Sequence, residues 1–379
     1  MSAILPGATI GILGGGQLGR MTAMAARSLG FHVHALDPDA SCAARFVVER
    51  CLMAQFDDDF AAADLARHCQ VVTLEIEKIS IAALEAAGRY APVRPGPRVL
   101  EIVQDRSKQK AWLRERGFPL GPYEDASSGE GVRQASQRLG GAAFVKAARG
   151  GYDGRSQVRI TSPVEGAAAF ESLGKGPVVV EKALEIESEV SVLVARTPSG
   201  GIAVYEPALN HHENRILAWS VLPAPIDPAV AKKVREVASA VAAALAIEGL
   251  LVVEFFLVKG GALYVNELAP RPHNSFHATE VACATSQFEQ AVRAVCDLPL
   301  GSTEVLRPAA IRNLLGDLWG EDRTPHFDAA LALPGVRLHL YGKRVARPGR
   351  KMGHLSAQGK TPQDAVLLVE EAYRRLAPV

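Results

Sequence analysis

The sequence has almost no net charge and no hydrophobic run long enough to cross a bilayer. Forty-two Lys and Arg residues nearly balance 41 Asp and Glu residues, which gives a formal net charge of +1. No general attraction to nucleic acid or to an anionic membrane surface is therefore expected. A spanning helix needs roughly 20 consecutive apolar residues, and no stretch approaches that length. Residues 1–13 lack a basic leader and a small-residue cleavage site, so we expect no signal peptide.

Cysteine is scarce and irregularly spaced. The five cysteines are odd in number and contain no C-x-x-C pair. This pattern argues against a disulfide framework and against a zinc site, and it favours free thiols in a reducing, cytoplasmic compartment. The nucleotide-binding pattern G-x-x-x-x-G-K-[ST] is also absent, which excludes an ordinary P-loop. The cysteines are Cys42, Cys51, Cys69, Cys283 and Cys296.

A glycine-rich turn follows the first apolar run. Residues 9–13, TIGIL, predict a buried strand, and residues 14–19, GGGQLG, fit G-x-G-x-x-G before a helix-like segment. Asp37 ends a second apolar run about twenty residues later, as in dinucleotide-binding domains. Glycines let the backbone approach a phosphate, and the helix N-terminus supplies N–H donors. The pattern alone leaves three interpretations open, namely NAD, another phosphate, or a tight turn with nothing bound.

The chain predicts a mixed α/β and α+β protein. Strands and helices alternate from residue 9 to residue 77, which favours a parallel, doubly wound sheet. Residues 91–100 contain three prolines and are expected to form a linker. A charged helix at 105–117, antiparallel hairpins up to 269 and an alanine-rich helix at 229–249 follow. A region rich in proline and glycine begins near 301 and ends in a helix at 361–377.

Lys146 ends an apolar strand and precedes a second glycine-rich loop, residues 150–155. A lysine beside such a loop suits a nucleoside triphosphate, because the ammonium pairs with phosphate oxygens while the loop closes over them. Taken alone, the same residues are explained better by a β-hairpin with a glycine bulge.

Two acids lie in neighbouring apolar strands. Glu254 in VVEFF and Glu267 in YVNELA are joined by a short turn at 259–261, so antiparallel pairing would bring their carboxylates together. Buried carboxylates are costly unless a cation neutralises them. Two carboxylates plus substrate phosphates are a usual arrangement for Mg²⁺, and Asn266 offers a further oxygen. We therefore favour a metal site over two surface acids.

Two further segments carry anion-binding groups. Arg271, His273 and Asn274 directly follow the second acidic strand, and Arg271 offers a planar fork for a carboxylate or phosphate. Residues 347–354, RPGRKMGH, hold three cations and two glycines. That segment predicts an anion-binding loop, with a solvated basic turn as the alternative.

Together these motifs resemble the 5-(carboxyamino)imidazole ribonucleotide synthases, a branch of the ATP-grasp enzymes in purine biosynthesis. The likeness runs in order through GGGQLGRM, FVKAARGGYDGR, VVVEKAL, ESEVSV, NELAPRPHNS, TSQFEQ and RPGRKMGHL. It implies a Rossmann-like pre-ATP-grasp domain at 1–104, an ATP-grasp domain at 105–300 with a mobile lid at about 120–185, and a small β-rich domain at 301–379. It also implies that the glycine turn serves the ribonucleotide site and binds no NAD.

The resemblance implies the roles of individual residues as well. Asp153, Arg271, His273 and Lys351 would be catalytic, and Glu254 and Glu267 would bind Mg²⁺ or Mn²⁺. The ATP site would comprise Arg106, Lys146, Gly151, Tyr152, Asp153, Gly154, Arg155, Glu181, Lys182, Ala183, Leu184, Glu189, His212, Asn266 and Glu267. The acceptor site would comprise Gly16, Gln17, Leu18, Glu75, Glu77, Tyr152, Arg155, Asn274, Ser275, Arg347, Arg350 and Lys351.

The implied reaction is the carboxylation of aminoimidazole ribonucleotide with ATP and bicarbonate, through carboxyphosphate, in a cytoplasmic homodimer. Phe276, Arg215 and Leu209 depart from the family pattern, where we expect glycine, glycine and glutamate. A ring at Phe276 is expected to narrow the site. These departures leave room for an ATP-grasp paralogue with another acceptor or a non-catalytic binding protein, and the glycine turn leaves room for an NAD-dependent oxidoreductase.

Overall fold

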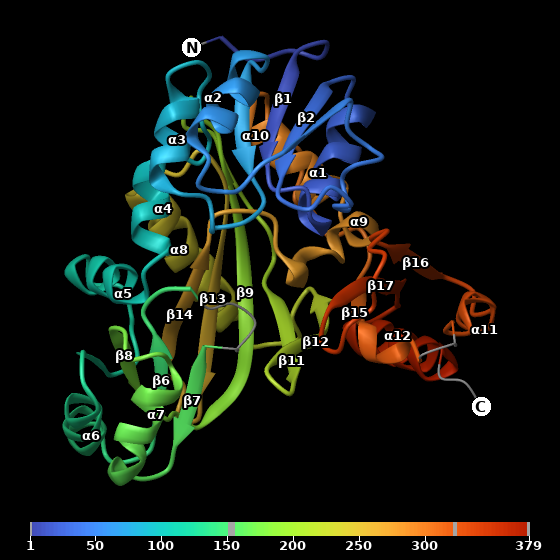
Figure 1. The fold of residues 1–379 in the computed structure, drawn as a ribbon. Coiled ribbons are helices and arrows are strands. Elements are labelled where there is room, and N and C mark those ends of the chain that lie inside the picture. The colour runs from blue at the N-terminus through green and yellow to red at the C-terminus, as the bar shows by residue number, and fades with distance from the viewer. Residues whose placement is uncertain (1, 151–155, 321–323, 377–379) are drawn as a thin grey trace.

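The computed structural model describes residues 2–150, 156–320 and 324–376. Three sheets organise the chain (Figure 1). A parallel sheet lies at the top and a small antiparallel sheet lies at the lower left. A long central sheet begins below the parallel sheet and extends to the C-terminal strands at the right. No helix within the described ranges is both long and apolar enough to span a membrane.

The N-terminal sheet is parallel, with strand order β3-β2-β1-β4. The strands are β1 (Thr9–Leu13), β2 (His32–Asp37), β3 (Arg50–Met53) and β4 (Val71–Leu74). The helices are α1 (Gln17–Ser28), α2 (Asp59–Arg67), α3 (Ile81–Gly88) and α4 (Pro97–Val103). Strands β1 and β4 are buried almost throughout, as expected for a parallel sheet covered on both faces. The predicted doubly wound sheet is therefore present.

A small antiparallel sheet, with strand order β5-β8-β6-β7, forms the second unit. Its strands are β5 (Tyr123–Ala126), β6 (Ala143–Ala147), β7 (Gln157–Ile160) and β8 (Val178–Lys182). Its helices are α6 (Gly129–Arg138) and α7 (Gly166–Ser172), and α5 (Arg106–Glu115) leads into it. Val132 and Ala135 of α6 pack on Val145 and Val180, so this lobe has a core of its own.

The central sheet runs β14-β13-β9-β11-β12-β15-β17-β16, with β10 beside β9. Its strands are β9 (Ile186–Arg196), β10 (Ile202–Val204), β11 (Ala208–Glu213), β12 (Ile216–Leu222), β13 (Gly249–Val258), β14 (Leu263–Ala269), β15 (Ala309–Leu315), β16 (Val336–Leu340) and β17 (Lys351–Gln358). The remaining helices are α8 (Pro228–Leu245), α9 (Thr279–Ala282), α10 (Gln287–Val295), α11 (Phe327–Leu331) and α12 (Pro362–Leu376). Because β12 pairs with β15, the C-terminal strands extend this sheet.

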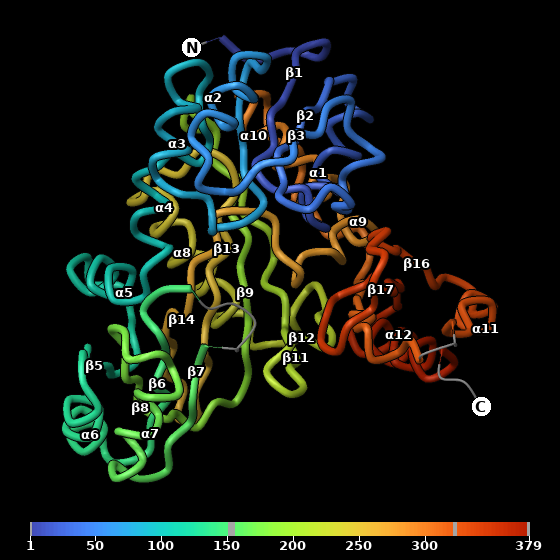
Figure 2. The backbone as a smooth tube through the Cα atoms, in the orientation of Figure 1, coloured from blue at the N-terminus to red at the C-terminus, as the bar shows by residue number. Residues whose placement is uncertain are grey.

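The N-terminal and central parts share buried apolar side chains. Val292 and Val295 of α10 pack against Ile10 and Val33 of the first sheet, although more than 250 residues separate them in sequence. In Figure 2 the orange segment of α10 accordingly lies beside the blue strands β1 and β2. This packing holds the glycine turn in a defined position relative to the central sheet.

Two sequence expectations fail locally. Residues 91–100 were expected to be a linker, yet α4 begins at Pro97, because proline is well suited to the first turn of a helix. Strand β3 and helix α3 were not predicted at all. Strand β3 has only four residues, all of them partly or fully exposed, so it carries little hydrophobic signal.

Candidate active site

A buried ion-pair cluster lies between the small lobe and the central sheet. The Glu181 carboxylate in β8 accepts from Lys146 Nζ at 2.8 Å and lies 3.1 Å from Lys110 Nζ. Burial favours the neutral acid, but the two ammonium groups outweigh it and hold the pKa of Glu181 at about 2. Lys146 is thereby held in place at the end of β6, as its predicted phosphate-binding role requires. Lys110 was not predicted as a site residue, because it lies in a helix rich in charged residues and its burial leaves no signal in the sequence.

The predicted pairing of the two acids is confirmed. Glu254 of β13 lies opposite Glu267 of β14, whereas the next pair is Phe255 with Val265. Asn266 is therefore a bulge residue, and it lines the same small cavity as Glu267 and Lys146. Strict alternation would send Asn266 and Glu267 to opposite faces, so the bulge is what allows both to serve one site.

The two acids differ in exposure, although both were expected to be buried. Glu267 is exposed, whereas the Glu254 side chain is only 20 % exposed. Burial, followed by the nearby Glu267 and Glu189 carboxylates, raises the pKa of Glu254 to about 8. Carboxylates so close together match the oxygen ligands of Mg²⁺, and the charges of Arg271 and Lys351 do not outweigh their mutual repulsion and burial. The donor set therefore fits the predicted divalent ion.

Arg271 and His273 lie beside these acids. Arg271 Nε is 2.8 Å from Glu77 Oε1, and His273 Nε2 is 3.2 Å from Glu254 Oε1. Burial, reinforced by the positive charges of Arg271 and Lys351, lowers the pKa of His273 well below its usual value. His273 is consequently neutral at physiological pH, and Glu77 restrains Arg271 within the site.

Ser275 and Gln287 hold His273 in position. His273 Nδ1 is 2.8 Å from Ser275 Oγ, and the Gln287 side chain bonds both the backbone N–H and the carbonyl of His273. Ser275 is completely buried and also accepts from Ser191 Oγ. Ser275 therefore packs behind His273, and its contact with the acceptor stays a prediction.

The glycine turn is occupied by carboxylates of the protein itself. Gly15 N donates to Asp37 Oδ2 at 2.7 Å, and Gly16 N and Gly19 N donate to the two Glu75 oxygens at 2.5 and 2.6 Å. A β-carbon at Gly14 or Gly16 would collide with Glu75. The glycines therefore admit a side chain where a dinucleotide turn would admit a pyrophosphate.

Glu75 is held by the protein's own backbone. Its side chain is buried, and burial raises its pKa despite the two backbone hydrogen bonds. Both oxygens accept from N–H groups at the start of α1, and a contact of Glu75 with the acceptor stays a prediction. The side chain of Leu18 packs in a buried cluster with Met21, Phe288 and Tyr341.

Three parts of the chain meet at the predicted acceptor site. Gln17 Nε2 donates to Asn274 Oδ1 at 2.5 Å, and Lys343 Nζ donates to Gln17 Oε1 at 3.1 Å and to the Lys351 carbonyl at 2.6 Å. Lys343 was not predicted as a site residue, and it precedes the basic loop at 347–354. Arg350 lies nearby in sequence, and its guanidinium donates to the Val345 carbonyl at 2.8 Å.

The other predicted ATP-site residues lie along the lobe and the central sheet. Arg106 donates to the Ala147 carbonyl at 2.8 Å at the end of β6. His212 Nδ1 is 3.3 Å from Glu189 Oε2, so these two predicted ATP-site residues lie together. Lys182 ends β8, and Ala183 and Leu184 continue the chain beyond it. The predicted phosphate-covering loop lies outside the described residues, and it comprises Gly151, Tyr152, Asp153, Gly154 and Arg155.

The departures from the family pattern do not obstruct the cleft. Phe276 is fully buried and packs edge-on against Tyr205, with ring centroids 6.2 Å apart. It adopts the 3₁₀ turn Asn274–Phe276, so the expectation of a narrowed site is wrong. Arg215 adopts a left-handed φ of 68° in the β11–β12 turn, which explains why glycine suits that position. Leu209 is partly buried against the core.

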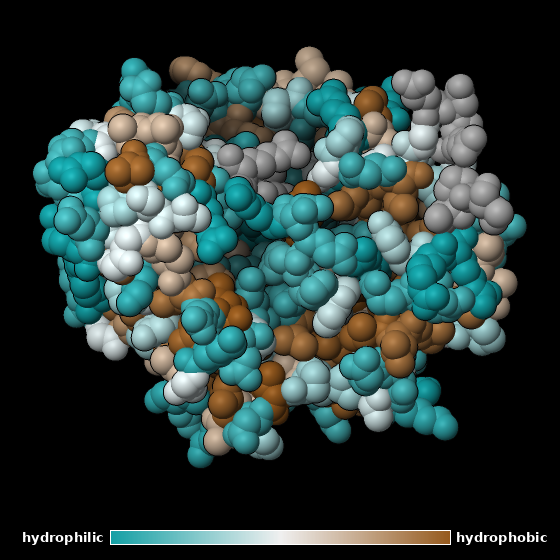
Figure 3. Space-filling view, turned by 90° about the horizontal axis from the view of Figure 1, so that it is seen from below, coloured by the Kyte–Doolittle hydropathy of each residue, from teal (hydrophilic) through white to brown (hydrophobic). Residues whose placement is uncertain are grey.

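A small cavity lies among the charged groups of the site. It has a volume of only about 10 Å³ and is lined by Lys110, Lys146, Glu181, Asn266 and Glu267. Such a set of charged side chains suits a charged ligand. Figure 3 shows that the face seen from below has a recessed, mostly hydrophilic area at its centre.

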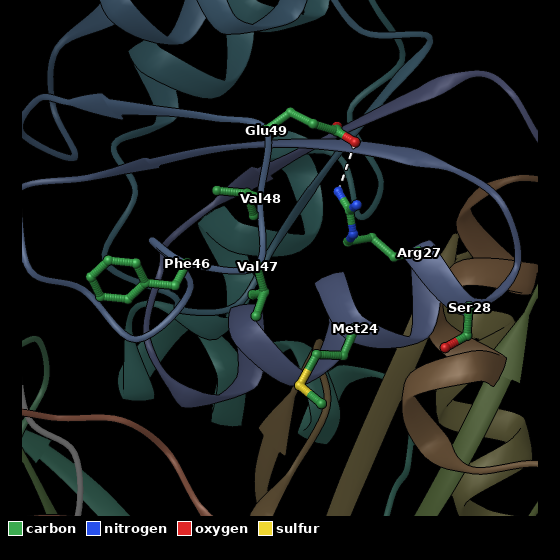
Figure 4. Close-up of a pocket in the computed structure, with 7 residues that line it drawn as sticks. All are labelled: Met24, Arg27, Ser28, Phe46, Val47, Val48 and Glu49. Carbon is green, nitrogen blue, oxygen red and sulfur yellow. Dashed lines mark hydrogen bonds and ion pairs between the residues drawn. The ribbon is translucent and has the colours of Figure 1, made fainter.

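A roomier cavity lies elsewhere. It has a volume of about 550 Å³ and is lined in part by Met24 and Phe46 (Figure 4). The Arg27–Glu49 ion pair crosses it, with a separation of 2.7 Å. Among the residues that the structure describes, no predicted site residue lines this cavity, so it is not the candidate active site.

Three family models cover most of the chain. Residues 7–104 match the ribonucleotide synthetase preATP-grasp domain and residues 111–288 match the ATP-grasp domain. Residues 309–366 match the phosphoribosylaminoimidazole carboxylase C-terminal domain. The fold class predicted from the sequence is thereby confirmed.

Known proteins resemble the chain over nearly its whole length. N5-carboxyaminoimidazole ribonucleotide synthase of Brucella melitensis biotype 1 is 44 % identical over 94 % of this chain and 97 % of the relative. An ADP complex of N5-carboxyaminoimidazole ribonucleotide synthetase superposes with a TM-score of 0.91, 38 % identity and 98 % coverage of each chain. The Aspergillus clavatus enzyme in complex with ADP and 5-aminoimidazole ribonucleotide gives a TM-score of 0.87 at 28 % identity, covering 97 % of this chain and 98 % of the other. The chain belongs to the N5-carboxyaminoimidazole ribonucleotide synthase family of ATP-grasp enzymes.

Proposed function

We propose that this protein uses ATP and bicarbonate to carboxylate 5-aminoimidazole ribonucleotide, forming N5-carboxyaminoimidazole ribonucleotide in purine biosynthesis. The observation that carries the proposal is that one group of charged side chains joins all the parts of such a site. Lys146 and Glu267 line one cavity, Glu254 lies opposite Glu267, and the charge of Arg271 acts on Glu254. A relative from Aspergillus clavatus binds ADP and the aminoimidazole ribonucleotide, which supports the same substrates here.

The charged groups divide the work of phosphoryl transfer. Lys146 is positioned by Glu181 to pair with phosphate oxygens of ATP. Glu254 and Glu267, with Asn266 beside them, would hold Mg²⁺. Bound there, the ion would neutralise charge that develops on the phosphates. Arg271 is available to stabilise the negative charge of bicarbonate and of the carboxyphosphate made from it.

The second half-reaction transfers the carboxyl group to the exocyclic amine of the ribonucleotide. Carboxyphosphate is labile in water, so the site must exclude solvent while the amine reacts. We assign the orientation of the amine to Asp153 and the grip on the acceptor phosphate to Arg347, Arg350 and Lys351. Neutral His273 accepts hydrogen bonds and adds no charge beside bicarbonate.

The proposal includes three domains, with boundaries at 1–104, 105–300 and 301–379. Within the second domain, residues 120–185 would form the lobe that closes over ATP. The enzyme would act as a cytoplasmic homodimer with Mg²⁺ or Mn²⁺ and without NAD. The occupied N–H groups of the glycine turn support the last point, because Glu75 and Asp37 take the donors that a pyrophosphate would need.

The decisive experiment measures ADP release with Mg-ATP and bicarbonate, with and without aminoimidazole ribonucleotide, together with incorporation of labelled bicarbonate. We expect strong stimulation by the ribonucleotide. ADP release that the ribonucleotide leaves unchanged would refute the acceptor, and turnover of another ATP-grasp acceptor would favour a paralogue.

Two glutamate variants test the metal site within the same assay. Glu267→Gln should remain folded but lose ribonucleotide-stimulated turnover, because a ligand of the divalent ion becomes a neutral amide. Glu185→Gln is the matched control, since Glu185 is exposed and lies outside the cleft. Normal turnover by Glu267→Gln would remove Glu267 from the proposed ligand set.

A further inference from the structure

Two histidines and a glutamate meet outside the cleft described above. His339 of β16 lies opposite His354 of β17, and Glu280 comes from α9 of the central region. One ligand atom from each of the three residues lies within 4.8 Å of the other two. We propose that Glu280, His339 and His354 form a second metal site, which takes a transition-metal ion of the zinc type.

The orientation of His354 favours metal binding. Its Nδ1 atom is 2.9 Å from the hydroxyl of Tyr341, and its Nε2 atom is 3.8 Å from Glu280 Oε2. A metal-binding histidine usually uses its second ring nitrogen in such an outer hydrogen bond, which fixes the ring and the tautomer. Tyr341 is fully buried, so this contact is held by the core. The nitrogen that remains is the one that faces the carboxylate.

Both imidazoles are in the form that binds metals. Burial, and then the proximity of His339, lowers the pKa of His354 to about 3. Burial and Arg20 lower the pKa of His339 as well. Both rings are therefore neutral near pH 7, with a lone pair available on a nitrogen. Burial also raises the pKa of Glu280 to about 7, because it outweighs the opposing charge of Arg337.

Two nitrogens and one carboxylate oxygen select against Mg²⁺, which prefers oxygen ligands, and favour Zn²⁺ or a similar ion. Zn²⁺ binds histidine nitrogen at about 2.0–2.1 Å, so the three groups must draw together slightly. Glu280 has a partly exposed side chain that can make this adjustment. An ion bound here would join the C-terminal strands to α9, which closely follows the segment that carries His273.

A purely packing role is the alternative. The His354 ring stacks between His277, at a centroid distance of 4.7 Å, and His339, at 5.2 Å. Stacked neutral rings need no ion to be stable. The distinction is therefore whether the chain takes up one equivalent of metal through these three side chains.

The test is a Zn²⁺ titration of the full chain after chelation and removal of bound metals, in competition with a chromophoric chelator. Saturating Mg²⁺ is present to fill the oxygen-rich site of Glu254 and Glu267. We expect one equivalent of Zn²⁺ per chain and a higher melting temperature when it is bound. Co²⁺ should show visible absorption typical of nitrogen ligands in low coordination.

Substitutions decide where the ion binds. His339→Ala and Glu280→Gln should each weaken Zn²⁺ binding at least tenfold, and Tyr341→Phe about tenfold through its loss of the His354 contact. His32→Ala is the matched control, because His32 also faces a carboxylate, Glu49, at 3.1 Å on the surface. Less than one equivalent bound, or uptake unchanged by both ligand substitutions, would overturn the proposal.

Discussion

The ion-pair cluster around Glu181 makes a quantitative prediction. Glu181→Gln keeps the shape of the side chain but leaves Lys146 and Lys110 without their shared carboxylate. The folded-state pKa of Glu181 is about 2, compared with about 4.3 for an unperturbed glutamate. A depressed folded-state pKa contributes stability that is present above the unfolded pKa and is lost as pH falls toward the folded one. The difference corresponds to about 3 kcal/mol at pH 7 and about 2 kcal/mol at pH 3.5.

Urea unfolding of wild type and Glu181→Gln at pH 7 and pH 3.5 measures both quantities. Glu185→Gln is the control, because its side chain is 82 % exposed on the loop that follows the same strand. We expect that control to stay within about 0.5 kcal/mol of wild type. The reasoning fails if Glu181→Gln is as stable as wild type at pH 7, or if the difference grows on acidification.

Three further outcomes follow from the same geometry. Gly16→Ala should destabilise the fold, because a β-carbon there would collide with Glu75 Oε1 and would displace the carboxylate from the turn; unchanged urea unfolding would contradict it. Burial raises the pKa of Glu254 to about 8, compared with about 4.3 for an unperturbed glutamate. Without divalent cations, the stability of the wild type should therefore fall as pH rises between these two values, whereas that of Glu254→Gln should not. At pH 8 the variant should thus be more stable, by up to about 5 kcal/mol, and Mg²⁺ should narrow the difference. Ser275→Ala should lower kcat more than it raises KM for ATP, because His273 loses its Nδ1 partner; a change in KM alone would contradict this.

The sequence by itself determined the parallel N-terminal sheet, the strand that carries Lys146 and the pairing of Glu254 with Glu267. These features follow from local signals, namely apolar runs of strand length, glycine turns and alternation about a short loop. The family resemblance supplied the order of the parts and the functional hypothesis, because its motifs span nearly the whole chain.

Only the tertiary structure decided what the glycine turn holds. G-x-G-x-x-G describes a backbone that permits close approach, but the approaching group, Glu75, lies 59 residues from Gly16. The sequence also did not predict three other features. These are the bulge at Asn266, the burial of Lys110 beside Glu181 and the inward position of Phe276. Each depends on contacts between segments distant in sequence, whereas hydrophobic periodicity reports only how one segment meets an unspecified core.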